Sequence, residues 1–130
     1  MWYEMNYSDE ADLLRVEIYG QRPSDLNELK RVSHEAWTEI ARRTNDLGKR
    51  KLLVVSHATG SYSTVSAYEI NTTLAKCGVR SGWMIAFVAL DLDSYDEVKF
   101  CETVAVNRGF QVGVFANEEA GRQWLADRAG

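Results

Sequence analysis

The sequence has one proline, two cysteines and no apolar run longer than the one from Trp83 to Leu90. That run is far shorter than the roughly 20 apolar residues that a membrane-spanning helix requires. The N-terminus also lacks the basic segment followed by an apolar one that marks a signal peptide. We therefore expect no membrane span and a cytoplasmic location.

Cysteine and histidine are too scarce to suggest a metal centre. Cys77 and Cys101 lie within helix-like patterns and outside any CxxC motif, so we expect buried thiols that pack in the core rather than a disulfide. The two histidines, His34 and His57, are far apart and have no second ligand nearby. The sequence therefore predicts no zinc site of the usual His/Cys kind.

Positive charge is also in short supply. The formal net charge is −4 and the isoelectric point is near 5.2, which disfavours a nucleic-acid partner because phosphate neutralisation needs a basic surface. The glycine-rich stretches at 78–82 and 109–113 contain neither G-x-G-x-x-G nor a P-loop. We expect no nucleotide or other cofactor.

The composition is that of a globular domain. The chain has 130 residues, of which 45% are hydrophobic and 26% are charged, which is enough to build one hydrophobic core. It contains no internal repeat, low-complexity segment or linker. We therefore expect a single domain over residues 1–130.

The first part of the chain shows the two-residue period of strands and then the spacing of a helix. Alternation of apolar and polar residues in 3–7 and 13–19 predicts a two-stranded hairpin. Pro23 with Ser24 or Asp25 opens a helix that should reach about Thr44. Its apolar residues recur at three- and four-residue steps: Leu26, Leu29, Val32, Ala36, Trp37 and Ile40.

Strand and helix patterns then alternate. The continuous apolar runs 52–55 and 84–90 predict strands covered on both faces. Between them a second helix, with Ala67, Ile70, Leu74 and Cys77 on its buried side, should end at Gly78. A third helix should begin at the capping box Ser94–Glu97 and end at Gly109. After a short strand at 111–115, Asn117 should cap a last helix with Ala120, Trp124 and Leu125 inward.

The order of these elements predicts an α/β fold. Helices between successive strands make the strands parallel, and the opening hairpin adds an antiparallel edge. We expect a single-domain mixed sheet of five strands with four helices. The hairpin aromatics Trp2, Tyr3 and Tyr7 would leave an apolar edge, which favours a homodimer.

Two segments near the end of the chain suggest a family. The element order, VAVNRG at 104–109 and VFANEEAGRQWL at 114–125 resemble the SpoIIAA-like proteins of the STAS group, which includes the anti-sigma factor antagonists and the cytoplasmic domains of sulfate transporters. The resemblance covers Leu14 to Leu125. It is strongest to a subset of small bacterial proteins without an assigned function, some of which are related in fold to lipid-transfer proteins of the CRAL-TRIO kind.

The resemblance directs attention to the loop between the third strand and the second helix. In the anti-sigma factor antagonists this loop carries a phosphorylatable serine within Asp-Ser-Ser-Gly, a pattern that is absent here. The resemblance therefore implies a regulatory loop without choosing one serine. The candidate binding or regulatory residues are Ser56, His57, Thr59, Ser61, Ser63, Thr64 and Ser66.

Three interpretations of this loop are open. Ser66 with Glu69 has capping-box spacing, and Ser63 or Thr64 would cap one turn earlier. Alternatively, the loop and second helix form a docking surface that phosphorylation would alter. A small-molecule site is the third interpretation, because Ser56 and His57, like Asp91 and Asp93, follow parallel strands at the edge where such sheets bind ligands.

The resemblance implies a non-enzymatic regulatory or protein-interaction domain that binds a partner through this loop and the second helix. The alternative is a carrier of a small ligand, either apolar and lipid-like or anionic. Ser61 or Ser63 with His57 and an aspartate would make a catalytic triad, but the G-x-S-x-G motif is absent. We therefore expect no enzyme activity.

Overall fold

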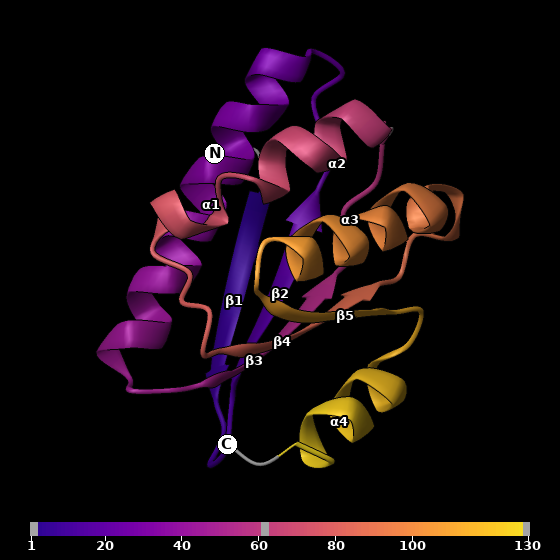
Figure 1. Cartoon of the computed structure of the whole chain (residues 1–130). Helices are drawn as coiled ribbons and strands as arrows, with labels where there is room; N and C mark the ends of the chain where they lie inside the picture. The colour runs from indigo at the N-terminus through magenta and orange to yellow at the C-terminus, as the bar shows by residue number, and fades with distance from the viewer. Residues whose placement is uncertain (1–2, 61–62, 129–130) are drawn as a thin grey trace.

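The computed structural model describes residues 3–60 and 63–128, apart from the side chains of Thr64 and Ser66. Within these residues the chain forms the predicted α/β arrangement of five strands and four helices, with two short 3-10 helices (Figure 1). The elements are β1 Tyr3–Asp9, β2 Leu14–Gly20, α1 Leu26–Asp46, β3 Lys51–Ser56, α2 Thr64–Asn71, η1 Leu74–Cys77, β4 Met84–Ala89, η2 Leu92–Ser94, α3 Tyr95–Asn107, β5 Gln111–Phe115 and α4 Glu118–Ala126.

The strands lie in the sheet in the order in which they occur in the chain, β1-β2-β3-β4-β5. β1 and β2 are antiparallel, and every later neighbour is parallel, which confirms the predicted mixed sheet. Helices α1, α2 and α3 cover one face of the sheet, and α4 lies alone on the other face (Figure 1). The fold is therefore a three-layer arrangement with unequal outer layers.

The central strand β3 shows why a continuous apolar run predicts a strand covered on both faces. Leu52 and Val54 pack beneath the three helices, whereas Leu53 and Val55 pack beneath α4. All four side chains are at most 2% exposed. Since successive strand residues point to opposite faces, a strand between two helical layers is apolar on both faces along most of its length.

The first and last helices begin at the predicted capping residues. The Asp25 carboxylate accepts a hydrogen bond of 2.9 Å from the Glu28 backbone N–H. The Asn117 side chain accepts one of 2.8 Å from the Ala120 N–H. Each cap satisfies a backbone donor that the helix itself leaves unpaired.

The predicted inward face of the last helix is confirmed for Leu125, which is buried, and for Trp124, which is half-buried and packs against the same core cluster. Ala120 is half-buried, and Gly121, which was not predicted, is the other fully buried residue of α4. A Cβ atom on Gly121 would lie 3.0 Å from Val88 Cγ2 and 3.3 Å from Leu53 Cδ1. The missing side chain therefore lets α4 approach the sheet closely.

The second helix is shorter than predicted. α2 ends at Asn71, and the chain continues into η1 before Gly78 terminates it with φ of 99°. The Thr72 and Thr73 hydroxyls donate to the Glu69 and Ile70 carbonyls, which lie in the last turn of α2. Such local bonds compete with continued helix. The glycine stop was predicted correctly, whereas the unbroken helix was not.

The predicted capping box at Ser66 is wrong. α2 begins at Thr64, and the Ala67 N–H donates to the Ser63 carbonyl, so Ser63 is in the capping position and Ser66 is the third helical residue. The Glu69 carboxylate instead accepts a hydrogen bond of 2.8 Å from Lys30 Nζ on α1. The earlier alternative, a start at Ser63, is the one that the structure favours.

Tyr3 and Tyr7 do not form the apolar edge expected from the sequence. Tyr3 is buried against the core, and Tyr7 is half-buried with the Arg43 guanidinium 4.2 Å from its ring centre. Trp2 lies outside the described residues. In the described part of the chain, no helix has the length and apolarity to cross a membrane.

The close approach at Gly121 predicts a destabilised variant. Replacing Gly121 with Val should lower the free energy of unfolding by about 1–3 kcal/mol, because the added carbons collide with Val88 and Leu53. Urea titration followed by circular dichroism measures this change. Ala126→Val introduces the same side chain at an exposed position of the same helix, where no buried neighbour opposes it, and should be near neutral.

Candidate ligand-binding site

The first two predicted loop residues, Ser56 and His57, point to opposite faces of the sheet. Ser56 continues the face of Leu52 and Val54 and lines a cavity beneath the three helices. His57 points to the other face, where its Nε2 lies 3.0 Å from Glu17 Oε2. Two adjacent residues therefore belong to two different environments.

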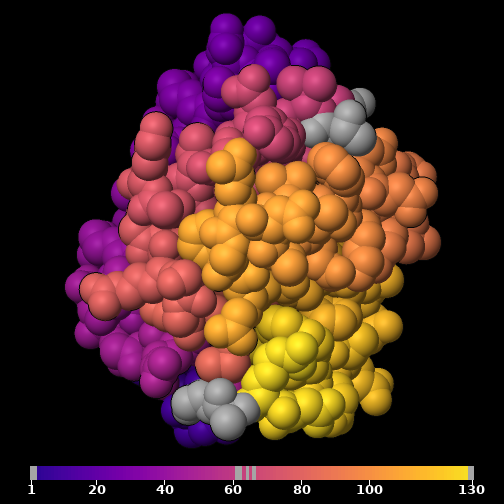
Figure 2. Space-filling model, in the orientation of Figure 1, coloured from indigo at the N-terminus to yellow at the C-terminus, as the bar shows by residue number. Residues whose placement is uncertain are grey.

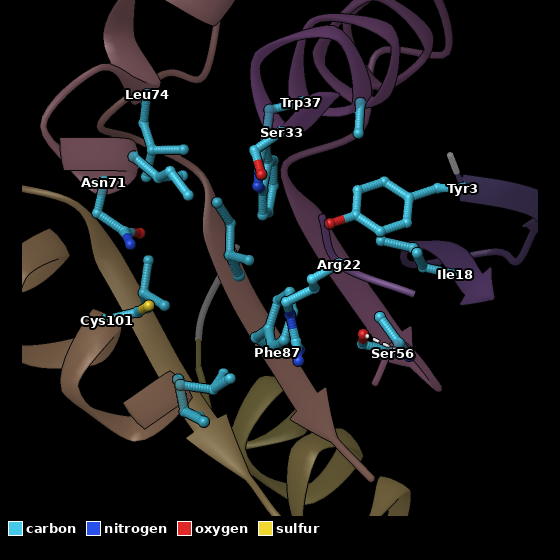
Figure 3. Close-up of a pocket in the computed structure, with 17 residues that line it drawn as sticks. Tyr3, Ile18, Arg22, Ser33, Trp37, Ser56, Asn71, Leu74, Phe87 and Cys101 are labelled. Carbon is cyan, nitrogen blue, oxygen red and sulfur yellow. Dashed lines mark hydrogen bonds between the residues drawn. The ribbon is translucent and has the colours of Figure 1, made fainter. Parts of the chain in front are cut away.

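The cavity lies between the sheet and helices α1, α2 and α3 and has a volume of about 80 Å³ (Figure 3). Parallel strands commonly bind ligands near their carboxyl ends, and Ser56, at the end of β3, reaches this space. Most of the lining is apolar, including Trp37, Leu74, Ile85, Phe87, Val98 and Val112. The space is therefore suited to an apolar group.

Several buried polar side chains also line this cavity. Asn71 is 9% exposed; its Nδ2 donates to the Ala67 carbonyl at 2.8 Å, and its Oδ1 accepts no hydrogen bond from the described residues. Ser33 lies in the lining beside the Tyr3 phenol, and Ser56 Oγ accepts from the Ala58 N–H. Buried polar groups normally find partners, and among the described residues no fully buried side-chain nitrogen or oxygen lacks one.

Arg22 supplies the positive charge in the lining. It follows β2, and although it is charged it is only 8% exposed. Its NH1 donates to the Gly60 carbonyl at 2.8 Å and to Ser94 Oγ at 3.1 Å. The Ser94 hydroxyl in turn donates to Asp91 Oδ2 at 2.8 Å. This chain of contacts ties the segments after β2, β3 and β4 to one guanidinium.

Ser94 explains why the predicted capping box of the third helix is wrong. Ser94 does precede the first residue of α3, but its side chain makes no capping hydrogen bond. The hydroxyl is buried and occupied by Arg22 and Asp91. Sequence spacing identified the start of the helix, and a long-range contact decided what the side chain does there.

Gly60 brings the loop close to Arg22. Its φ is 105°, and a Cβ atom there would lie 3.2 Å from the Arg22 backbone oxygen. Backbone hydrogen bonds join the same segments, since the Arg22 N–H donates to the Thr59 carbonyl and the Thr59 N–H to the Gly20 carbonyl. Both the conformation and the space require glycine.

The charge of Arg22 also affects the buried phenol of Tyr3. Burial raises the pKa of Tyr3 above its ordinary value, and the positive charge of Arg22 partly offsets that increase. A hydrogen bond with Ser33 acts in the same direction as Arg22. The cavity wall therefore combines a neutral phenol, hydroxyl groups and a cation within one largely apolar space.

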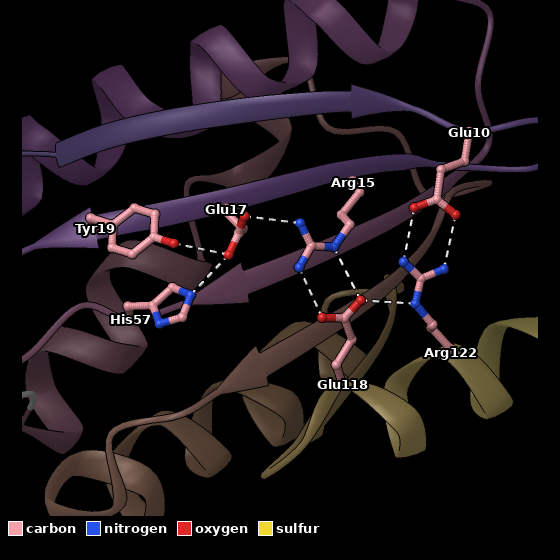
Figure 4. A network of polar contacts seen from close by, with 7 residues as sticks. All are labelled: Glu10, Arg15, Glu17, Tyr19, His57, Glu118 and Arg122. Atoms are coloured by element: carbon pink, nitrogen blue, oxygen red, sulfur yellow. Dashed lines mark hydrogen bonds and ion pairs between the residues drawn. The ribbon is translucent and has the colours of Figure 1, made fainter.

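The face that carries His57 holds a row of ion pairs (Figure 4). The His57 ring stacks on Tyr19 at 4.3 Å between ring centres, and the Tyr19 hydroxyl donates to Glu17. Arg15 pairs with Glu17 at 3.0 Å. Hydrogen bonds from Arg15, His57 and Tyr19, whose effects on the pKa decrease in that order, lower the pKa of Glu17 to about 2.

The row continues onto the last helix. Arg15 donates two hydrogen bonds to Glu118, and Arg122 of α4 contacts both Glu118 and Glu10. Hydrogen bonds from Arg15 lower the pKa of Glu118, and those from Arg122 lower the pKa of Glu10. These contacts join α4 to the hairpin on the face of β2 opposite the cavity, so a structural role accounts for them.

Of the remaining predicted loop residues, the structure describes the side chains of Thr59 and Ser63. Thr59 is exposed and contributes its backbone to the pairing with Gly20 and Arg22, and Ser63 is exposed at the start of α2. Ser61 and the side chains of Thr64 and Ser66 lie outside the described residues. Of the two strand-end aspartates, Asp91 supports Ser94 and Asp93 is exposed.

The described residues contain no arrangement suited to the triad considered from the sequence. His57 contacts Glu17 and Tyr19, on the face opposite the cavity. Cys77 and Cys101 are both buried, as predicted, and no disulfide joins them. In the described part of the chain, no three His, Cys, Asp or Glu side chains gather as a metal site.

Sequence patterns did not identify the most distinctive residues of the cavity. Arg22 precedes Pro23 between a strand and a helix, where periodicity has no signal. Asn71 and Ser33 had a weak sequence signal, because each is a polar residue that interrupts an apolar helical stripe next to buried neighbours. Comparison of the chain with protein-family models and with curated proteins gave no match. The resemblance to SpoIIAA-like proteins therefore stays a prediction.

The row of ion pairs predicts loss of stability in acid. Glu17 has an ordinary pKa of 4.5 and a folded pKa of about 2, so the unfolded chain binds a proton there first as the pH falls. Its stabilising contribution is complete above about pH 5 and decreases as the pH approaches 2. Urea unfolding at a series of pH values should show a shallower acid dependence for Glu17→Gln than for the wild type.

Glu119→Gln is the matched control, since this carboxylate is exposed on α4. It should retain the acid dependence of the wild type. Equal slopes for the Glu17→Gln variant and the wild type would contradict the assignment of this dependence to the row of ion pairs.

Proposed function

We propose that this protein is a non-enzymatic domain that binds a small ligand in the cavity between the sheet and helices α1 to α3. The observation that carries the proposal is the combination of an apolar space of about 80 Å³ with the buried polar side chains of Arg22, Asn71 and Ser33. Known ligand sites have this character: mostly apolar walls and a few placed polar groups.

The size of the cavity limits what it encloses. An apolar cavity of roughly 150 Å³ holds benzene, so a space of about 80 Å³ accommodates a group of only a few heavy atoms. A long acyl chain would not be enclosed. Of the two ligand types considered from the sequence, a compact anionic molecule therefore fits better than a lipid-like one.

A binding role without catalysis is supported by the position of His57. Its imidazole is held between Glu17 and Tyr19, whereas Ser56 and Arg22 line the cavity on the opposite face. A general base must reach the group that it deprotonates. The loop therefore contributes its backbone and Ser56 to a binding site.

Filling the cavity should abolish binding. Ala36 lines the cavity from α1 and is 4% exposed, so Ala36→Leu places three further carbons in the ligand space. Native mass spectrometry of protein isolated gently from its host should show a small-molecule adduct on the wild type. Occupancy should fall at least tenfold in the variant.

Thr38→Leu, at an exposed position of the same helix, should keep the adduct. Circular dichroism of each variant establishes that it is folded. An adduct that persists in folded Ala36→Leu would place the ligand elsewhere and refute the proposed site.

A second candidate function is binding of a protein partner through α2. Val65 and Tyr68 on this helix are 56% and 52% exposed, and both are large apolar side chains. In the space-filling view, α2 (rose) and α3 (orange) lie side by side at the surface (Figure 2). An exposed apolar face is a common feature of interaction surfaces.

The two candidates are separated by a surface variant. Val65→Asp should remove a co-purifying protein by placing a charge in an apolar contact, whereas Leu47→Asp, at another exposed apolar position beyond the end of α1, should keep it. The readout is the amount of partner recovered in a pull-down with the tagged chain. Equal recovery with both variants would exclude α2 as the contact surface.

A further inference from the structure

We infer that Lys99 and Glu102 of α3 block the open edge of β5, because their side chains occupy the place of a residue on a neighbouring strand. This blocking pair keeps a second copy of the chain from adding its own β5 to the sheet. The role does not depend on ligand binding.

The sheet ends at β5 in the part of the chain that the structure describes. There β5 pairs with β4 alone, and α3 and α4 contact it from the two faces of the sheet (Figure 1). A strand at the margin presents a row of backbone N–H and C=O groups that can pair with another chain. Such an edge must be covered or blocked if the protein is not to associate through it.

The outward-facing backbone groups of Val114 are both occupied by side chains of α3. The Val114 N–H donates to Glu102 Oε2 at 2.7 Å, and the Val114 carbonyl accepts from Lys99 Nζ at 2.9 Å. Lys99 Nζ also donates to the same Oε2 at 2.8 Å. The blocking pair thus offers Val114 one acceptor and one donor, as a residue of an antiparallel neighbour does in a hydrogen-bonded pair.

The spacing of the two residues on α3 lets them act together. Lys99 and Glu102 are three residues apart, so they lie on the same face of the helix. Their side chains are 45% and 31% exposed, and an ion pair as exposed as this one contributes little to stability by itself. Hydrogen bonds from charged groups to the backbone are stronger than neutral ones. The contacts with Val114 therefore distinguish this pair from an ordinary surface ion pair.

The sequence of β5 explains why the protection comes from a helix. Edge strands often carry charged residues that oppose pairing with another chain, but the β5 sequence QVGVF has none. Nothing in the strand itself would repel a second copy of β5. Because two identical edges can pair about a two-fold axis, each contact would form twice.

Val112 shares this edge with Val114. Successive strand residues direct their backbone groups to opposite sides, so the N–H and C=O of Val112 face the same margin. Beside the strand lies a groove of about 400 Å³, lined by the exposed side chain of Val106 and the half-buried rings of Phe115 and Trp124, among others. Without the blocking pair, a second β5 would gain backbone hydrogen bonds and cover apolar surface there.

A double variant tests this role. Lys99→Ala with Glu102→Ala removes the blocking pair, keeps good helix formers in α3 and leaves the net charge unchanged. In analytical ultracentrifugation, its mass should rise with protein concentration to twice that of the wild type at the same concentration. Lys30→Ala with Glu69→Ala is the matched control, because this ion pair has the same charges and distance, 2.8 Å, but joins α1 to α2. The control should sediment like the wild type.

A proline assigns the association to the edge of β5. Proline has no backbone N–H and is tolerated where that side of an edge strand is open. Adding Val112→Pro to the double variant should therefore restore the mass of the wild type. Amide hydrogen exchange gives a second measurement: the Val114 N–H should exchange faster in the dilute double variant than in the wild type and become protected as the concentration rises. If the proline variant does not fold, this concentration dependence carries the test.

Three results would overturn the inference. The first is a double variant with the mass of the wild type at every concentration. The second is association that persists in a folded variant with Val112→Pro, or that the control pair shows equally, because the contact would then lie elsewhere. The third is exchange of the Val114 N–H that does not change with removal of the pair or with concentration.

Discussion

The strands lie in the sheet in chain order, and this constraint decides where the other parts of the molecule are placed. Crossovers between parallel strands have one hand, so a sheet that grows in one direction puts every crossover helix on the same face. Helices α1, α2 and α3 share that face, and only α4 is left for the other. Since α4 packs on β3, β4 and β5, the outer face of β2 is covered by the ion pairs of Arg15 and Glu17 instead.

The fold was predictable because most elements have one period and a clear boundary. One error in the predicted elements occurred where the same spacing of buried residues suits two local structures. Leu74 and Cys77 are three residues apart, which suits a 3-10 turn as well as an α-helix, so the buried stripe concealed the end of α2 at Asn71. Gly121 was missed for another reason: hydrophobic patterns count side chains, and the closest contact of α4 with the sheet requires that one be absent.

The candidate site was only partly predictable. The sequence directed attention to the carboxyl end of β3, and Ser56 does line the cavity there. The two-residue period of strands would have placed His57 on the opposite face, but the loop was interpreted as one cluster of polar residues. Arg22 had no comparable signal, because its burial depends on Gly60 and Ser94, 38 and 72 residues away. Contacts of that range are set by topology rather than by local pattern.

The cavity also matters for the stability of the fold. Leu52 and Val54, on the same face of the sheet, have no exposed surface, which shows how tightly this sequence packs elsewhere. A cavity costs stability relative to such packing, and buried polar groups add to that cost except where hydrogen bonds offset it. Apolar side chains at positions 33 and 71 would remove that cost, and a capping bond from Ser94 would stabilise α3 further. Around this cavity, Ser94 departs from the local rule for helix capping, and the polar residues at positions 33 and 71 lower the stability of the fold. This pattern is expected where a protein binds something other than itself.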